Sequence, residues 1–223
     1  MKRVLIALLC LPLLALFACQ LEKLDDDPFF AVIASMIDGL EQALAEIEPD
    51  ELEQLAQEIG VDSSELLDYY RNRFREHVRY ALHDIDGKEV MLIDSEGGRE
   101  FTLYAIQNGV AVLQGSWDDH SGRIESPVLF ENGTILVVQH LEGHISHRHF
   151  RFEGEELVLY AILSHETGIE NPHFYHRDRV GNRRMAEFTR ITEAEFEWLR
   201  AELEGGDPAE LDWRPVAEFG RQQ

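Results

Sequence analysis

The chain has few cysteines and few basic residues, and both shortages limit what it can do. The 223 residues include only two cysteines, Cys10 and Cys19. A domain formed by the residues after Cys19 therefore has no disulfide and no thiol nucleophile. The chain has 43 acidic residues against 20 lysines and arginines, a formal net charge of −23. Such a charge repels nucleic acid and anionic lipid head groups, so we expect no nucleic-acid partner.

The sequence also lacks the common catalytic motifs. It has no Gly-x-Ser-x-Gly nucleophile turn, no glycine loop that would cradle a phosphate and no dinucleotide fingerprint. Carboxylates are too numerous for any pair to be singled out as an acid and base couple. These absences favour a non-enzymatic binding or interaction protein over an enzyme.

Long apolar runs are missing after residue 18. The one such run extends from Val4 to Ala18, follows Met1-Lys2-Arg3 and contains Pro12. Its fifteen residues are fewer than the roughly 20 that a membrane-spanning helix needs. A basic start followed by a short apolar run is typical of a cleaved signal peptide, which we place at residues 1–18.

The end of this run, Leu16-Phe17-Ala18-Cys19, resembles the lipobox of bacterial lipoprotein signal peptides, although Phe17 stands where that family usually has a smaller residue. The resemblance implies cleavage before Cys19 and acylation, palmitate included, of that cysteine. It also implies a localisation. Gln20, rather than Asp, follows the cysteine, which indicates the outer membrane, with the protein facing the periplasm. The alternative is an ordinary secretory signal with an incidental cysteine.

Cleavage before Cys19 would leave a compact, strongly acidic protein close to a membrane. It removes Lys2 and Arg3 and no acid, so the charge of the remaining 205 residues becomes −25. Residues 19–27 form a short polar tether, and its part after the cysteine, residues 20–27, reaches about 25–30 Å when extended. Two or more acyl chains hold a protein firmly at a bilayer. A length of 205 residues suits one domain, or one domain with a small helical appendage.

Residues 28–83 have the pattern of three helices. Asp27-Pro28 provides an N-cap and a first-turn proline, and apolar residues then recur every three or four positions. Pro49 begins a second helix that ends at Gly60. A third follows the capping-box pattern Asp62-Ser-Ser-Glu65, and the apolar spacing continues it to about residue 83.

Residues 84–191 change to an alternating pattern with turn residues between the segments, which predicts an antiparallel β domain. Asn108-Gly109 and Asn132-Gly133 are strong hairpin signals. The eight predicted strands are Glu89–Asp94, Glu100–Gln107, Val110–Trp117, Ile124–Phe130, Thr134–Leu141, Ser146–Phe152, Leu157–Leu163 and Arg183–Ile191. We expect an antiparallel meander, closed as a barrel or folded as a sandwich.

The last segment, residues 192–223, is predicted to pack on the β domain. Thr192 and Glu195 frame a capping box for a helix at about 193–204, and Trp213, Val216 and Phe219 supply apolar contacts after it. The fold class is therefore α+β: an N-terminal helical segment, the strands, and a C-terminal helix.

The strand region is similar to lipocalin-like domains of small bacterial lipoproteins. The similarity lies in Gly115-Ser-Trp117, in the glycine-punctuated hairpins and in Ala186-Glu-Phe-Thr-Arg190. Gly115-Ser-Trp117 is on the third predicted strand, whereas a lipocalin has its Gly-x-Trp on the first. The resemblance therefore implies an up-and-down topology and no particular ligand.

Histidines are the one enrichment among chemically active residues. A hairpin turn at Glu142-Gly143 places His140, His147 and His149 on one face of the sheet, whether the loop has two residues or four. Three imidazoles on adjacent strands could bind Zn²⁺ or Cu²⁺. The alternative is a polar, solvent-facing half of the sheet, with Phe150 and Phe152 buried on the other side.

A second group of polar residues, His165, Glu166, His173 and His176, is predicted to lie in a long solvated loop before the last strand. Loops often carry function, but His165-Glu166 lacks the second histidine of a metalloprotease motif. Taken together, the sequence predicts a lipid-anchored envelope protein that binds a protein partner or a small apolar ligand and needs no cofactor. The alternative function is metal binding through His140, His147 and His149.

Overall fold

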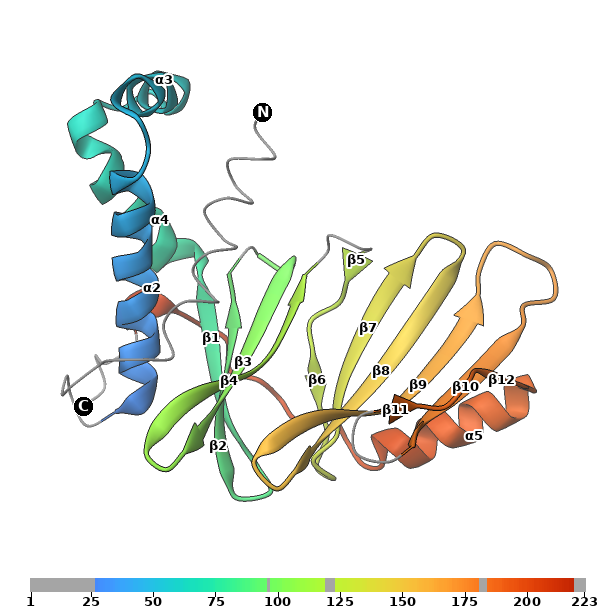
Figure 1. The fold of residues 1–223 in the computed structure, drawn as a ribbon. Coiled ribbons are helices and arrows are strands. Elements are labelled where there is room, and N and C mark those ends of the chain that lie inside the picture. Colours follow the sequence, from blue (N-terminus) through green and yellow to red (C-terminus); the bar gives the residue numbers. More distant parts are fainter. Residues whose placement is uncertain (1–26, 96, 119–122, 181–183, 219–223) are drawn as a thin grey trace. The chain divides into compact units, whose positions relative to one another are not determined.

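The computed structural model describes residues 27–95, 97–118, 123–180 and 184–218 (Figure 1). Within them, four α-helices and two antiparallel sheets form an α+β fold, so the predicted fold class is confirmed. The chain divides into two compact units. The first comprises the described residues up to Tyr80, residues 106–112 and the chain from Trp213 onward, and the second comprises residues 81–105 and 113–212.

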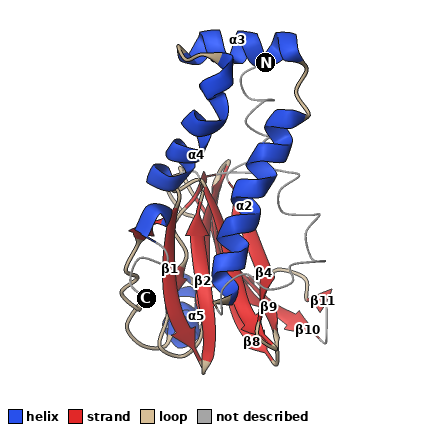
Figure 2. Ribbon diagram, turned by 90° about the vertical axis from the view of Figure 1, so that its left-hand side faces the viewer, coloured by secondary structure: helices blue, strands red, loops and turns tan. Residues whose placement is uncertain are grey.

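The helices of the first unit begin where their capping residues predict. They are α2 (Pro28–Ala45), α3 (Pro49–Ile59) and α4 (Leu66–His77), with a short 3₁₀ helix, η1 (Ser63–Glu65), before α4 (Figure 2). Asp27 Oδ1 accepts a hydrogen bond of 2.9 Å from the Phe29 backbone N–H, and Asp62 Oδ1 accepts one from Ser64. Both caps satisfy backbone donors that the first helical turn leaves without partners.

Helix α2 packs on α4, and Arg71 of α4 pairs with Glu41 of α2. Phe29, Ile33 and Leu40 are among the buried residues of α2. By length and composition alone, α2 is also the one described helix that could cross a membrane. A core helix near the N-terminus passes the same criterion, and the pairing with α4 is what a core helix would show.

The third helix is shorter than predicted. The observed helix α4 ends at His77, whereas helix was expected to about residue 83. Residues 79–85 instead form a strand, β1 (Arg79–Ile85). Val78 and Leu82 are four residues apart, a spacing that suits a helix, but Leu82 is exposed while Tyr80 and Ala81 are buried. The chain after the last helix pairs with this strand: β13 (Arg214–Pro215) lies antiparallel to β1, and Val216 N–H donates to the Val78 carbonyl.

The smaller sheet has the strand order β13-β1-β2-β3-β4, with β2 at Lys88–Asp94, β3 at Glu100–Gln107 and β4 at Val110–Asp118. Its turns match the hairpin signals of the sequence. Asp86-Gly87 and Asn108-Gly109 have positive φ at both residues, which two-residue turns between twisted strands require. Asp84 Oδ1 accepts from the Gly87 N–H at 2.8 Å and supports the first of these turns.

The larger sheet has the order β11-β10-β9-β8-β7-β5, with β6 also pairing with β7 and β12 with β10. Its strands are β5 (Arg123–Ile124), β6 (Val128–Leu129), β7 (Ile135–Leu141), β8 (His144–Glu153), β9 (Glu156–Glu166), β10 (Phe174–Val180), β11 (Arg184–Met185) and β12 (Thr189–Ile191). The described strands thus form two sheets of five and eight strands and no closed barrel, so the barrel alternative is wrong.

Two strand predictions in this sheet also differ from the structure. The single strand expected at 124–130 is divided into β5 and β6, which both pair with β7. The single strand expected at 183–191 is likewise divided into β11 and β12, which both pair with β10. Short strands separated by irregular backbone keep a sheet edge from being long and flat.

Helix α5 (Glu193–Glu204) covers one face of the larger sheet. Thr192 Oγ1 accepts from Glu195 N–H and the Glu195 carboxylate accepts from Thr192 N–H, which completes the predicted capping box. Phe196 and Leu203 of the helix pack with Ala161 and Leu163 of β9 in a buried apolar cluster. The predicted last helix is therefore confirmed at both ends.

The C-terminal end of α5 is held by polar side chains of the sheet. The Leu203 carbonyl accepts hydrogen bonds from Asn132 Nδ2 (3.1 Å), Thr134 Oγ1 (2.9 Å) and Arg151 Nη2 (3.4 Å). The last carbonyls of a helix have no partner within it, so these donors stabilise the helix end. They also fix where α5 lies on the sheet.

Candidate functional site

The β7–β8 hairpin decides where the predicted histidines lie. Its loop has two residues, Glu142-Gly143, and pairs His140 with Ile145 and Val138 with His147. Cross-strand partners share a face of the sheet, and alternate residues of one strand do too. His140, His147 and His149 therefore lie on one face, and the pairing of Ile145 with His165 adds His165 of β9. We call this surface the histidine face.

The histidine face lies beneath α5. The Phe196 ring of the helix lies 5.7 Å from the His147 ring and 5.5 Å from the His165 ring, centroid to centroid. His149 is 0% exposed, whereas Phe150 and Phe152 are half-buried. The interpretation of this face as solvent-facing is therefore wrong, because α5 packs on the histidines and not on the phenylalanines.

The structure does not gather the three predicted histidines around one point. His140 Nε2 lies 2.6 Å from Glu125 Oε1, and His149 Nε2 lies 3.9 Å from Glu204 Oε1. His147 instead contacts the rings of Phe196 and His165. Among the residues that the structure describes, no group of three or more His, Cys, Asp or Glu side chains could hold a metal ion. Zinc or copper binding stays a prediction without a preformed ligand set.

Burial favours the neutral imidazole at His147 and His165. It lowers the pKa of His147 to about 4, with smaller contributions from His149, His165 and Arg200, while Glu204 acts in the opposite direction. Burial also lowers the pKa of His165. The Nδ1 atoms of both residues and both ring nitrogens of His149 are buried without a hydrogen-bond partner among the described residues. Protonating His147 or His165 would leave a charge beside the Phe196 ring, which both of them contact.

The second predicted group is not in a long loop, because β9 extends to Glu166 and residues 174–180 form β10. His173 Nδ1 lies 2.9 Å from Glu166 Oε2, and His176 Nε2 lies 2.8 Å from Asp178. A hydrogen bond from the His173 backbone N–H is the main reason that the pKa of Glu166 is lowered. His165 belongs to the histidine face, so the four residues do not form one constellation.

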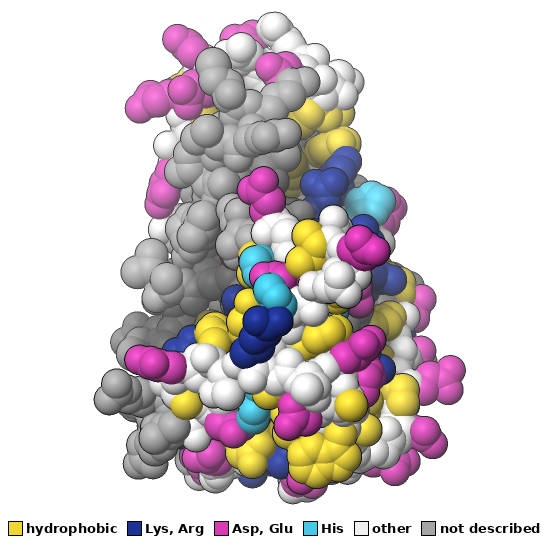
Figure 3. Space-filling view, turned by 90° about the vertical axis from the view of Figure 1, so that its right-hand side faces the viewer, with side chains coloured by type: hydrophobic (Ala, Val, Ile, Leu, Met, Phe, Trp, Pro, Cys, Tyr) yellow, Lys and Arg dark blue, Asp and Glu magenta, His cyan; other side chains and the backbone are white. Residues whose placement is uncertain are grey.

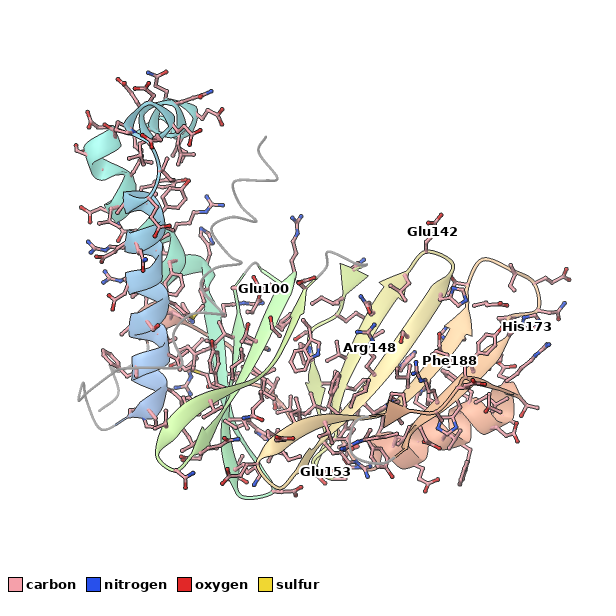
Figure 4. All side chains as sticks on the ribbon, viewed as in Figure 1. Glu100, Glu142, Arg148, Glu153, His173 and Phe188 are labelled. Atoms are coloured by element: carbon pink, nitrogen blue, oxygen red, sulfur yellow. The ribbon has the colours of Figure 1, made fainter. Side chains whose placement is uncertain are left out.

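The opposite face of the larger sheet carries a feature that the sequence analysis did not single out. Register places Val137, Arg148, Ile162 and Arg177 in one row across β7, β8, β9 and β10. Because Arg148 lies between His147 and His149 in sequence, it points away from α5. We call this surface, which also includes the neighbouring rows, the arginine face; Figure 4 labels Arg148 on it.

Both arginines of the row lack a carboxylate in the part of the chain that the structure describes. Arg148 is half-buried, makes no hydrogen bond or ion pair there, and has its pKa lowered by burial alone. The Arg177 guanidinium lies 5.2 Å from the centroid of the Phe188 ring, and its buried Nε has no hydrogen-bond partner among the residues that the structure describes. In contrast, Arg179 on the same strand pairs with Glu153 at 2.5 Å.

The rows on either side of the arginines differ in polarity. On one side Gln139, Ser146, Ser164 and Tyr175 are aligned, so this row carries hydroxyl and amide groups. On the other side Ile135, Phe150 and Leu159 are aligned, and Trp117 of β4 contacts the Phe150 ring edge-on at 5.4 Å. The arginine face therefore changes from apolar to polar along the strands, and Arg148 and Arg177 lie in the row between the apolar and the polar row.

A signal for the arginine face was present in the sequence. The run His147-Arg148-His149 alternates in a strand, so a face that gathers histidines must place Arg148 on the other side. Arg177 could not be added, because β10 was taken for a loop. Cys19, the predicted lipidation residue, lies outside the described residues.

Comparisons of the chain with protein-family models, with curated proteins and with solved structures find no significant match. The roles of these residues are therefore inferred from their own contacts and chemistry.

Proposed function

We propose that this protein is a lipid-anchored protein of the bacterial cell envelope, held at the outer membrane and facing the periplasm, and that it binds a ligand or partner without catalysis. The anchor is Cys19, supported by Leu16-Phe17-Ala18-Cys19 after a short apolar run and by Gln20 as the next residue. The tether of residues 19–27 keeps the folded part within about 30 Å of the bilayer.

The observation that carries the binding function is the arginine face. One face of the larger sheet is covered by α5 and its core, and the opposite face carries two arginines that have no carboxylate partner among the described residues. Arg148 has no described partner although the chain has 43 acidic residues. A half-buried charge without a partner lowers stability, so its presence favours a binding role.

We further propose that the two sheets form a sandwich, the second of the two folds that the sequence predicts. Support comes from contacts within the second unit. Trp117 of β4 packs on Phe150 of β8, and Gln114 Oε1 of β4 accepts a hydrogen bond of 3.1 Å from the Leu157 N–H of β9. In this arrangement the arginine face is turned toward the smaller sheet.

The anchor is tested by expressing the full chain in a bacterium that processes lipoproteins and separating membrane from soluble fractions. We expect Cys19→Ala to release the protein from the membrane fraction or to leave it unprocessed, because the substitution removes the thiol that the lipid would modify. Cys10→Ala is the matched control, since Cys10 lies in the apolar run and is discarded with it. Firm anchoring of a processed Cys19→Ala protein would overturn the proposal.

Metal binding is the second candidate. The observation that favours it is the set of buried imidazole nitrogens of His147 and His149 that have no hydrogen-bond partner among the described residues. Neutral imidazole is a good ligand for Zn²⁺ and Cu²⁺. Elemental analysis of the purified protein and of His147→Ala tests it: one metal equivalent that the substitution removes would support the role, and no bound metal would eliminate it.

A further inference from the structure

We propose that the arginine face binds an amphiphile with an anionic head group, a phosphate or a carboxylate on an apolar chain, and that Arg148 and Arg177 hold the head group. This inference rests on the proposed binding function and names the class of ligand. The head group lies over Ile162, between the two guanidinium groups, and the chain extends over the apolar row that contains Phe150.

The spacing of the two arginines suits one anion. Both are aligned with Ile162, so one strand separates them and their Cα atoms lie roughly 9–10 Å apart. Arginine side chains are long enough to converge across that gap on one group of oxygens. Guanidinium binds carboxylate and phosphate through paired N–H donors, and two guanidiniums match an anion with several oxygens.

The charge of the site has no described counterpart within the protein. Arg148 is half-buried and lacks an ion pair, and Arg177 is held against the Phe188 ring and not against a carboxylate. Charged side chains that leave water are ordinarily paired. An anion from outside the chain would satisfy both guanidiniums.

The neighbouring rows indicate an amphiphile and not a free ion. Ser146, Ser164 and Tyr175 form the polar row beside the arginines. The Ser164 hydroxyl donates to the Ile145 carbonyl at 3.1 Å and the Tyr175 hydroxyl to Glu166 Oε1 at 3.4 Å, so Ser146 is the member of this row whose hydroxyl can donate to an anionic oxygen. On the other side Phe150 and Leu159 offer apolar surface for a chain. A net charge of −23 also opposes a free anion in solution, so burial of an apolar chain is needed to add affinity.

Titration calorimetry on the full chain in nanodiscs of neutral phosphatidylcholine tests the inference, with empty nanodiscs as the blank. The probes are decyl phosphate, decan-1-ol and inorganic phosphate. We expect decyl phosphate to bind at least about tenfold more tightly than either of the others. Arg148→Gln and Arg177→Gln should each weaken the binding of decyl phosphate by about tenfold or more and leave the affinity for decanol unchanged.

Arg99→Gln is the matched control, because Arg99 is an exposed arginine in the turn between β2 and β3. Near-ultraviolet circular dichroism checks the fold of each variant, and Arg148→Gln should not unfold, since it removes a half-buried charge without a described partner. Equal loss in Arg99→Gln and Arg148→Gln would overturn the site. Inorganic phosphate that binds as tightly as decyl phosphate would overturn the amphiphile class.

The remaining outcomes separate this inference from the proposed function. If decyl phosphate and decanol bind equally well and the arginine variants change neither, the head-group site is wrong and apolar ligand binding stands. If neither amphiphile binds, the inference and the small-ligand form of the proposed function fail together. Membrane anchoring through Cys19 is measured separately and is untouched by either result.

Discussion

His147, beneath α5, shows how burial on one face of a sheet affects the pKa of a side chain. His147 contacts the Phe196 ring, and His149 is fully buried. Burial favours the neutral imidazole of His147, because a charged ring would lose its hydration without gaining a strong partner. The Glu204 carboxylate, at 3.9 Å from His149 Nε2, is too far away for a hydrogen bond.

These histidines predict that the fold loses stability in mild acid. The pKa of His147 falls from 6.5 to about 4 on folding, so between these values the unfolded chain binds more protons than the folded one. Its contribution is fully present above pH 6.5 and is lost as the pH falls toward 4, by up to about 3 kcal/mol. We expect the free energy of unfolding, measured in urea, to decrease over this interval.

His147→Gln should flatten that decrease, because an amide does not titrate. The groups that face His147 are His149 and His165 on the sheet and Arg200 and Glu204 on α5, and they remain in the variant. His144→Gln is the control, since His144 is exposed at the hairpin turn. The assignment to His147 would be wrong if both variants kept the same slope against pH as the unsubstituted protein.

At the scale of elements, the sequence predicted best where side chains act on the backbone within a few residues. The capping box of Thr192 and Glu195 placed α5 correctly, and Asn108-Gly109 placed the β3–β4 hairpin. In both cases the signal is a hydrogen bond or a turn conformation that needs no distant partner.

The sequence predicted worst where distant pairing decides the structure. Residues 79–85 kept a helical spacing of apolar side chains, yet they pair with β2 and with β13 from the far end of the chain. Residues 174–180 have few β-branched side chains, and they form β10 because β9 pairs with them. The same long-range pairing brings Arg177 into the row of Arg148. Because residues 174–180 were predicted to be a loop, Arg177 was missed as a residue of the candidate site.

Helix α5 should contribute strongly to the stability of the second unit. Phe196 is 1% exposed and contacts Phe174, His147 and His165, so Phe196→Ala removes a large buried ring. We expect the free energy of unfolding to fall by about 3–5 kcal/mol, measured in urea. Trp198→Ala on the same helix is the control: Trp198 is 62% exposed, and its loss should change the value by less than about 0.5 kcal/mol. Equal effects of the two substitutions would contradict this packing.

At the scale of the whole molecule, net charge and anchoring support each other. Carboxylates are spread over the face that Figure 3 shows, and a chain cleaved before Cys19 would have a charge of −25, which offers no electrostatic attraction to anionic lipids. A protein of this charge that works at a membrane needs a covalent lipid or an apolar segment to stay there. The expectation of a lipid anchor follows from composition and from the first 20 residues alone, and the structure does not describe those residues.

Composition and pattern also gave the α+β class and the antiparallel strands, but not the way the strands divide. Eight strands at even spacing suit one closed barrel as well as two sheets. The described strands form two sheets, because β4 is followed by the short strands β5 and β6, which pair with β7 and not with β4. The division depends on contacts that no local pattern contains.

The central claim is that Cys19 becomes the acylated first residue of the mature protein. It is tested most directly by mass spectrometry of the N-terminal peptide of protein purified from membranes. We predict a peptide that begins at Cys19, lacks residues 1–18 and carries two or three acyl chains. A peptide that retains residues 1–18, or one that contains an unmodified Cys19, would contradict the claim.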